Sequence, residues 1–209
     1  IGMSKRYSNL LLGLAIVVLA ACSSAPKQES VKKGGSPTVA AKPTDVEPQI
    51  AALYQRAIAT LKSGDENNAL IQFQSIAEKA PQLAGPFINM GLIHLRKQRY
   101  QDAEQALLQA TTVKPNDAVA QNHLGIVLRE QGKFDKAGQA YQQAIQIDPN
   151  YANAHLNIAV LYDIYLNDLP KALQHYEKYQ ALTDNKDDQL PKWIADVKQR
   201  LSQLNKGKN

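Results

Sequence analysis

The stretch AVAQNHLGIVLREQGKFDKAGQAYQQAIQIDPNY, residues 118–151, decides the fold of this chain. Its apolar residues form two runs, and Gly132 interrupts the first run and marks a turn. Pro149 ends the second run, because a proline inside a helix loses a backbone hydrogen bond and clashes with the preceding turn. The stretch therefore predicts two antiparallel helices joined by a short turn.

The same pattern recurs along the chain with a period of 34 residues. Five kinds of position keep this step: Pro81, Pro115 and Pro149; Ala69, Ala103 and Ala137; Phe73, Leu107 and Tyr141; Met90, Leu124 and Ile158; Gly91, Gly125 and Ala159. A period of about 34 residues with a helix–turn–helix pattern indicates an all-α solenoid. Small residues at each helix crossing let two backbones approach, and bulky neighbours fill the space beside them.

These positions resemble the signature of the tetratricopeptide repeat. One regular repeat carries it at Phe87, Met90, Gly91, Ala103, Leu107, Ala110 and Pro115, and the next at Leu124, Gly125, Gly132, Ala137, Tyr141, Ala144 and Pro149. The resemblance implies four repeats over residues 49–183. The first repeat departs from the pattern at Arg56 and Thr60, as terminal repeats often do because one face meets water.

The fourth repeat departs from the 34-residue step after about residue 166. Ala172 follows Ala137 by 35 residues, and we place the inserted residue in the turn at 166–170. Residues 184–209 are expected to form a polar loop and then a helix, from Pro191 to about Leu204, that caps the solenoid. Its Trp193 either packs under the cap or anchors an interface, and packing is the favoured interpretation.

The beginning of the chain has the plan of a secretory signal peptide over residues 1–21. Lys5 and Arg6 precede an apolar run at residues 10–21, which is too short to span a bilayer. Residues 19–22, Leu-Ala-Ala-Cys, resemble the bacterial lipoprotein box, so Cys22 is expected to be lipid-modified, the alternative being a free cysteine. By the same resemblance, the absence of an aspartate after Cys22 favours the outer membrane.

Residues 22–48 have the composition of a disordered tether, rich in proline, glycine, serine and threonine. Three lysines in it serve either solubility and spacing or contact with anionic lipid headgroups, and spacing is favoured. The net charge is +5 over the whole sequence and +3 without Lys5 and Arg6, which is too mild to indicate a nucleic-acid partner.

The composition offers no chemistry of its own. A single cysteine excludes an intrachain disulfide and a zinc site of paired cysteines. The histidines fall in different repeats without a short metal-binding spacing, and no phosphate loop or nucleophile elbow is present: His94, His123, His155 and His175. We therefore expect no enzyme, no metal and no cofactor.

The resemblance implies that the first helices of successive repeats line a concave, peptide-binding groove. Transferring the family register gives the candidate groove residues: Tyr54, Gln55, Ile58, Asn89, Leu92, Arg96, Asn122, His123, Ile126, Arg129, Asn157 and Val160. Amides can pair with the main chain of an extended peptide, and arginine can hold a carboxylate with two hydrogen bonds. Alternatively, the asparagines belong to the repeat pattern and the arginines are solvated. The lysines of the chaperone-binding clamps are replaced by Gly85, Ile88 and Val119.

Together these features predict a lipid-anchored scaffold or adaptor on the periplasmic face of the outer membrane of a Gram-negative bacterium. It would bind a protein or peptide and recruit it to the membrane. The chain looks like lipoproteins that pilot type IV pilus secretins, and also like adaptors of cell-wall hydrolases or envelope motor complexes. An accessory subunit of an enzyme and a purely structural spacer remain alternatives.

Overall fold

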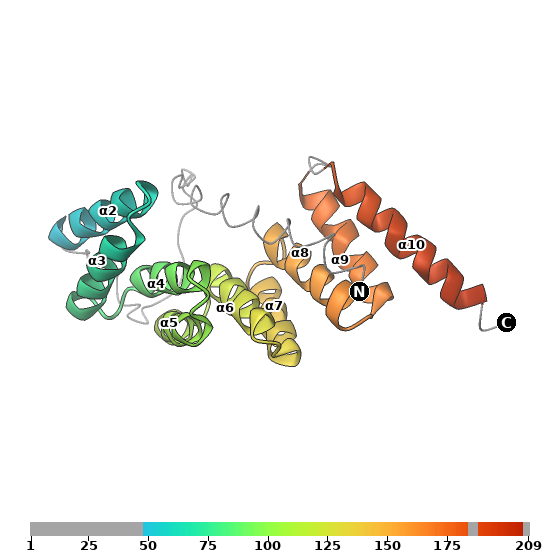
Figure 1. Cartoon of the computed structure of the whole chain (residues 1–209), viewed down its shortest axis with the longest axis horizontal. Helices are drawn as coiled ribbons and strands as arrows, with labels where there is room; N and C mark the ends of the chain where they lie inside the picture. Colours follow the sequence, from blue (N-terminus) through green and yellow to red (C-terminus); the bar gives the residue numbers. More distant parts are fainter. Residues whose placement is uncertain (1–47, 184–187, 207–209) are drawn as a thin grey trace, which may run out of the picture. The chain divides into compact units, whose positions relative to one another are not determined.

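The computed structural model describes residues 48–183 and 188–206, which all belong to one compact unit, residues 43–209. Every regular element in these two ranges is a helix, and Figure 1 shows most of them as successive helical hairpins. In chain order the elements are α2 (Pro48–Lys62), α3 (Glu66–Lys79), α4 (Ala84–Arg96), α5 (Tyr100–Val113), α6 (Ala118–Glu130), α7 (Phe134–Ile147), α8 (Ala152–Val160), the π-helical η3 (Leu161–Tyr165), α9 (Leu169–Leu182) and α10 (Leu190–Lys206). The expected signal peptide, Cys22 and the tether lie outside the described residues. Within them, no helix combines the length and apolar character that crossing a bilayer requires.

The core lies where the two helices of each pair cross. On the second helices an alanine and a large residue one turn later are inaccessible to solvent: Ala69 and Phe73, Ala103 and Leu107, Ala137 and Tyr141, Ala172 and Tyr176. Glycines on the first helices make room for these large side chains. A Cβ atom on Gly91 would lie 2.6 Å from Leu107 Cγ, and one on Gly125 would lie 2.5 Å from Tyr141 Cε1. The expected pairing of small and bulky residues at the crossings is confirmed.

Each pair turns through a residue with a positive φ angle. The four residues are Gly64 (φ 89°), Gln98 (56°), Gly132 (73°) and Asn167 (50°). This left-handed conformation at a helix end allows backbone N–H groups to reach the last helical carbonyls, and glycine adopts it without a Cβ clash. The turn residues thus repeat with the period of the sequence, except that the last step is 35 residues long.

The extra residue of the fourth repeat is accommodated upstream of the position that the sequence indicated. We expected the insertion in the turn at residues 166–170, whereas the helix itself widens at η3, directly before that turn. There the N–H of Leu166 donates to the carbonyl of Leu161 at 3.0 Å. A π-helical turn spans one residue more than an α-helical turn. It therefore absorbs the insertion, and Asn167 keeps the left-handed turn position.

Gln98 is the turn residue at which a substitution should stabilise the fold. A side chain in the left-handed region costs about 1–2 kcal/mol, which glycine avoids. Part of this gain is lost because glycine has more conformational entropy in the unfolded chain. We expect Gln98→Gly to raise the free energy of unfolding by about 0.5–1 kcal/mol, measured by urea denaturation. The reverse change at the equivalent position, Gly132→Gln, should lower it. If Gln98→Gly and Gly132→Gln were both as stable as the wild type, the left-handed turn at residue 98 would be contradicted.

The last helix, α10, closes the open end of the repeats as expected. It packs against α9 and buries Leu190, Ile194 and Val197, and its Trp193 ring lies 6.1 Å from the ring of Tyr176. Two polar contacts reinforce this packing at η3. The buried carboxylate of Asp163 pairs with Arg200 of α10 and accepts a hydrogen bond from the Tyr176 hydroxyl at 3.2 Å. Arg200 also pairs with Asp196.

Candidate binding face on the first helices

The first helices of neighbouring repeats contact one another directly. Helix α4 touches α6, and α6 touches α8, so side chains at equivalent positions follow one another from repeat to repeat. One such position holds Ile58, Leu92, Ile126 and Val160, spaced by 34 residues. The first three are partly exposed and Val160 is buried. We call Ile58, Leu92 and Ile126 the apolar line.

The candidate groove residues differ widely in exposure. Tyr54, Ile58, Leu92 and Ile126 are partly exposed, and Gln55 and Arg96 are exposed. The remaining candidates are buried: Asn89, Asn122, His123, Arg129, Asn157 and Val160. Burial alone does not decide whether a partner binds this face, but it identifies the side chains that are already enclosed within the fold.

The three asparagines connect successive repeats. The Asn89 side-chain amide donates to the Tyr54 hydroxyl at 2.8 Å and to the carbonyl of Gly85 at 2.9 Å. The Asn157 amide donates to Asn122 Oδ1 at 2.9 Å. Both inter-repeat bonds join residues 35 positions apart, so the same two register positions meet at the first and third boundaries between repeats. These amides are therefore engaged within the protein.

At the middle boundary this polar contact is missing. The equivalent pair, also 35 residues apart, is Ile88 and His123. Isoleucine offers no hydrogen-bonding group, and among the described residues neither ring nitrogen of His123 has a hydrogen-bond partner. Burial lowers the pKa of His123 to about 4, because a charged imidazolium would lose its hydration there. His123 is thus held neutral inside the fold.

Arg129 is also enclosed rather than presented to solvent. Its Nη2 donates to Glu130 Oε1 at 3.0 Å, and its side chain is only 2% exposed. Its Nε and Nη1 atoms have no partner among the described residues, and the same holds for the buried hydroxyl of Tyr141. Burial raises the pKa of Tyr141, so this hydroxyl stays neutral. A peptide carboxylate would reach the Arg129 guanidinium only after the covering side chains moved.

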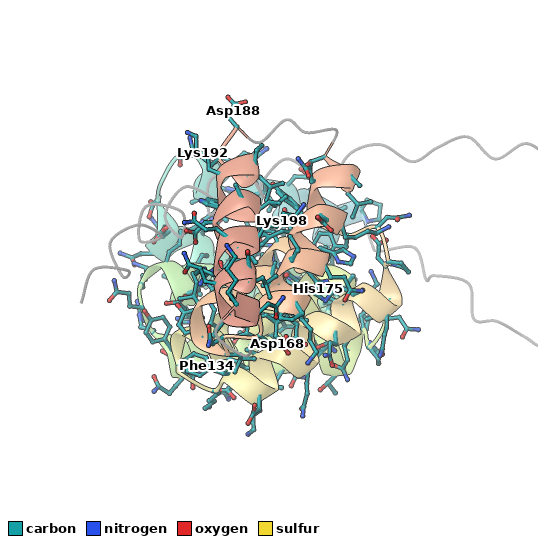
Figure 2. All side chains as sticks on the ribbon, turned by 90° about the vertical axis from the view of Figure 1, so that its right-hand side faces the viewer. Phe134, Asp168, His175, Asp188, Lys192 and Lys198 are labelled. Carbon is teal, nitrogen blue, oxygen red and sulfur yellow. The ribbon has the colours of Figure 1, made fainter. Side chains whose placement is uncertain are left out.

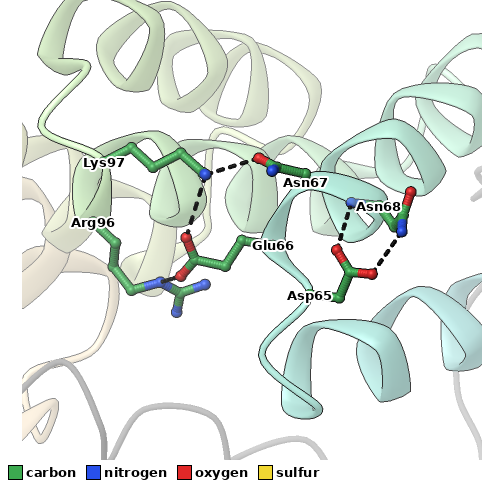
Figure 3. Close-up of polar contacts among 6 residues, drawn as sticks. All are labelled: Asp65, Glu66, Asn67, Asn68, Arg96 and Lys97. Atoms are coloured by element: carbon green, nitrogen blue, oxygen red, sulfur yellow. Dashed lines mark hydrogen bonds and ion pairs between the residues drawn. The ribbon is translucent and has the colours of Figure 1, made fainter.

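Arg96 takes part in an ionic contact between the first two repeats. Figure 3 shows Arg96 Nε pairing with Glu66 Oε1 at 2.6 Å, while Lys97 Nζ donates to Asn67 Oδ1 at 2.8 Å. A related contact joins the next two repeats. There Glu104 Oε2 accepts from Gln131 Nε2 at 2.8 Å and from Lys133 Nζ at 2.7 Å. Polar contacts thus link the second helices of the first two repeats, α3 and α5, to the turn of the repeat that follows.

The boundary between the third and fourth repeats uses aromatic rings in the corresponding place. The rings of Phe134, at the start of α7, and Tyr165, at the end of η3, lie 4.7 Å apart. Figure 2 views the domain from its α10 end and labels Phe134. The spacing of residues in the sequence did not predict this change from ionic to aromatic contact, because it depends on the π-helical turn that carries Tyr165.

The described residues contain no group of three or more histidine, cysteine, aspartate or glutamate side chains placed to hold a metal ion. The expectation of no metal or cofactor also concerns residues outside the described ranges, where Cys22 lies. The face on the first helices offers apolar side chains and amides that already make hydrogen bonds within the protein.

Comparison with known families agrees with this geometry. A family model described as a TPR repeat matches residues 127–163, and a second, described as a tetratricopeptide repeat, matches residues 84–117. The chain contains tetratricopeptide repeats. The second match spans the pair α4–α5 with Gly91 and Leu107. The first begins at residue 127, just after Gly125, and includes α7 with Tyr141. The resemblance to the tetratricopeptide repeat is therefore confirmed. Among curated proteins, none matches the chain.

Solved structures of similar fold support the tetratricopeptide solenoid. The protein TTC0263, a thermophilic TPR protein of Thermus thermophilus, is 25% identical with a TM-score of 0.61, and the match covers 72% of this chain and 82% of that one. A MamA fragment from Desulfovibrio magneticus RS-1 is 24% identical with a TM-score of 0.58, covering 66% and 78%. An O-GlcNAc transferase mutant of Thermobaculum terrenum is 23% identical with a TM-score of 0.59, covering 63% of this chain and 26% of the transferase. These likenesses establish the all-α repeat fold.

Proposed function

We propose that this protein is a lipid-anchored scaffold, which binds a segment of another protein along its first helices and holds it at the periplasmic face of the outer membrane. Tetratricopeptide proteins are generally non-catalytic interaction scaffolds, and the family matches support that general role. The anchor and the location rest on the sequence of residues 1–22, which resembles a signal peptide ending in a lipoprotein box.

The observation that carries the binding proposal is the apolar line. Ile58, Leu92 and Ile126 occupy one register position on three first helices and remain partly exposed. Solvent-exposed apolar side chains are common singly, whereas a regular series of them marks a surface that can bury another protein's side chains. A purely structural spacer would need no such series.

The polar groups beside this line narrow the kind of recognition that we propose. Asn89, Asn122 and Asn157 already make hydrogen bonds within the protein, and Arg129 is enclosed. Breaking such buried contacts to bind a ligand would cost about as much as each new hydrogen bond contributes. We therefore propose that the partner is held chiefly by apolar side chains and only secondarily by the amides and arginines.

The test compares two leucine substitutions in the same repeat. Leu92 lies on the first helix α4, and Leu108 lies on the second helix α5, where it is 47% exposed. We expect Leu92→Glu to reduce capture of the partner in a crosslinking pull-down from envelope membranes by about tenfold or more, because a buried carboxylate opposes apolar contact. Leu108→Glu introduces the same charge elsewhere and should capture as much partner as the wild type.

Two outcomes would contradict the proposal. Loss of the partner with Leu108→Glu but not with Leu92→Glu would move the binding surface to the second helices. If the Cys22→Ala protein stayed in the membrane fraction, the lipid anchor would drop out of the proposal, because an alanine at residue 22 cannot carry an acyl chain. Thermal unfolding of each variant ensures that lost capture does not reflect lost folding.

A further inference from the structure

Two histidines from neighbouring helices meet at the fourth repeat. His155 lies on α8 and His175 on α9, and their Nδ1 atoms are 3.0 Å apart. The other ring nitrogen of His155, Nε2, lies 3.1 Å from the carbonyl oxygen of Pro149, before α8 begins. Sequence spacing did not suggest this contact, because the two residues are 20 positions apart and belong to different helices.

The surroundings fix the tautomers of both imidazoles. A backbone carbonyl only accepts hydrogen bonds, so His155 must carry a proton on Nε2 and donate it to Pro149. A neutral His155 then has a lone pair on Nδ1. The contact between the rings consequently requires a proton on His175 Nδ1, which donates to His155 Nδ1. One hydrogen bond between neutral rings therefore joins α8 to α9.

Additional protons act in two steps, and only the second breaks the hydrogen bond. A first proton on His175 Nε2 leaves the contact in place, whereas one on His155 Nδ1 requires His175 to move its own proton to Nε2 and become the acceptor. A second proton places an N–H group on each side of the contact, so the hydrogen bond is lost and two positive charges face each other. The contact can therefore exist with no charge or one charge, but not with two.

The environment disfavours charge on the pair. His155 is buried, and His175 is half-buried, with its ring stacked 5.9 Å from that of Tyr162 in η3 (Figure 2, His175 labelled). Lys171 of α9 lies over the Tyr162 ring, with its Nζ 5.1 Å from the ring centroid. Burial lowers the pKa of His155, with Lys178 of α9 opposing charge there and the Pro149 carbonyl and Asp148 favouring it. Burial, followed by the neighbouring His155, lowers the pKa of His175 to about 4.

We propose that the His155–His175 pair is a proton-sensitive clasp, which holds α8 against α9 while both imidazoles are neutral and weakens this contact as the medium acidifies. An imidazole in an unfolded segment has a pKa of about 6.5, so below that pH the opened form binds more protons than the closed form. The clasp thus contributes its full stability above about pH 6.5 and loses it as the pH falls toward about 4. This device goes beyond the proposed binding role and does not depend on it.

The experiment measures amide hydrogen exchange of the purified full-length protein near pH 7.5 and near pH 5, corrected for the intrinsic pH dependence of exchange. We expect protection in α8 and α9 to fall about tenfold more than protection in α4 and α5 as the pH drops. The variant His175→Asn keeps a side-chain N–H donor for His155 and removes one titrating ring. In this variant the additional loss should shrink to about threefold or less.

His123 supplies the matched control, because it is another buried histidine of low pKa but lies on α6. His123→Leu should leave unchanged the additional acid-induced loss in α8 and α9, measured relative to α4 and α5. The proposal is overturned if His175→Asn shows the same additional loss as the wild type, or if His123→Leu abolishes the additional loss. Nitrogen chemical shifts of the imidazoles give an independent readout near pH 7.5, where a proton on His175 Nε2 instead of Nδ1 would also overturn it.

Discussion

Gly125→Val is expected to lower the free energy of unfolding by about 3 kcal/mol. A Cβ atom at this position would lie 2.5 Å from Cε1 and 2.6 Å from Cδ1 of Tyr141, closer than real Cβ contacts. These are ring atoms of a side chain that is 0% exposed, so the ring cannot turn aside into solvent. Either α6 and α7 must separate or Tyr141 must leave its rotamer. Urea denaturation followed by circular dichroism measures the change.

The control for this prediction is a glycine in the facing helix. Gly138 of α7 is buried, but a Cβ atom there would find Leu161 Cδ2 at 3.5 Å, an ordinary van der Waals distance. Gly138→Ala should therefore stabilise the protein by about 0.5–1 kcal/mol, because alanine restricts the unfolded chain more than glycine does. A Gly125→Val protein as stable as the wild type would mean that α6 and α7 do not approach so closely.

The crossing of Gly125 with Tyr141 shows why the core could be predicted from the sequence. A small residue on the first helix and a large residue on the second, recurring with a period of 34, are constrained by one crossing that is repeated from pair to pair. That constraint acts within a repeat, over short sequence distances, and leaves a periodic trace. The repeat helices and their buried alanines follow from the same periodicity, and the capping role of α10 follows from the apolar face that the sequence shows from Trp193 to Leu204.

Features that depend on contacts between repeats were less predictable. The shift from 34 to 35 residues revealed that one residue was inserted, but not whether it entered the turn or the helix before it. Only the backbone shows that η3 takes it up. Likewise, Asn122 was placed on the correct helix, whereas its hydrogen bond to Asn157 depends on which residue the next repeat presents 35 positions later.

The candidate binding face was also predictable only in part. The register of the family placed Leu92 and Ile126 on first helices, where both are partly exposed. The register did not reveal that Arg129 would be enclosed, because neighbouring side chains rather than its own position bury it. A polar residue at a groove position is therefore a weaker indication of ligand contact than an apolar residue that stays exposed.

The second large effect is expected at His123, where two costs of burial act on one side chain. Its ring nitrogens lack partners among the described residues, and an unsatisfied buried polar group costs about 1–3 kcal/mol. His123→Leu replaces the ring by an apolar side chain, at the boundary where Ile88 stands in the place that Tyr54 and Asn122 take at the other two. We expect the variant to be more stable than the wild type by about 1 kcal/mol near pH 7.5, measured by urea denaturation.

Acidification should enlarge this difference in a defined direction. The pKa of His123 is about 4 in the folded protein and about 6.5 in the unfolded chain, so below pH 6.5 the unfolded chain binds the extra proton. The wild type therefore loses about 2 kcal/mol of stability through this residue between about pH 7.5 and pH 5, and His123→Leu does not. The His155–His175 pair titrates in both proteins, so its contribution cancels in the comparison. A stability difference that stays constant over this pH range would mean that His123 is hydrated or bonded in the fold, and that Ile88 does not interrupt the series of contacts between repeats.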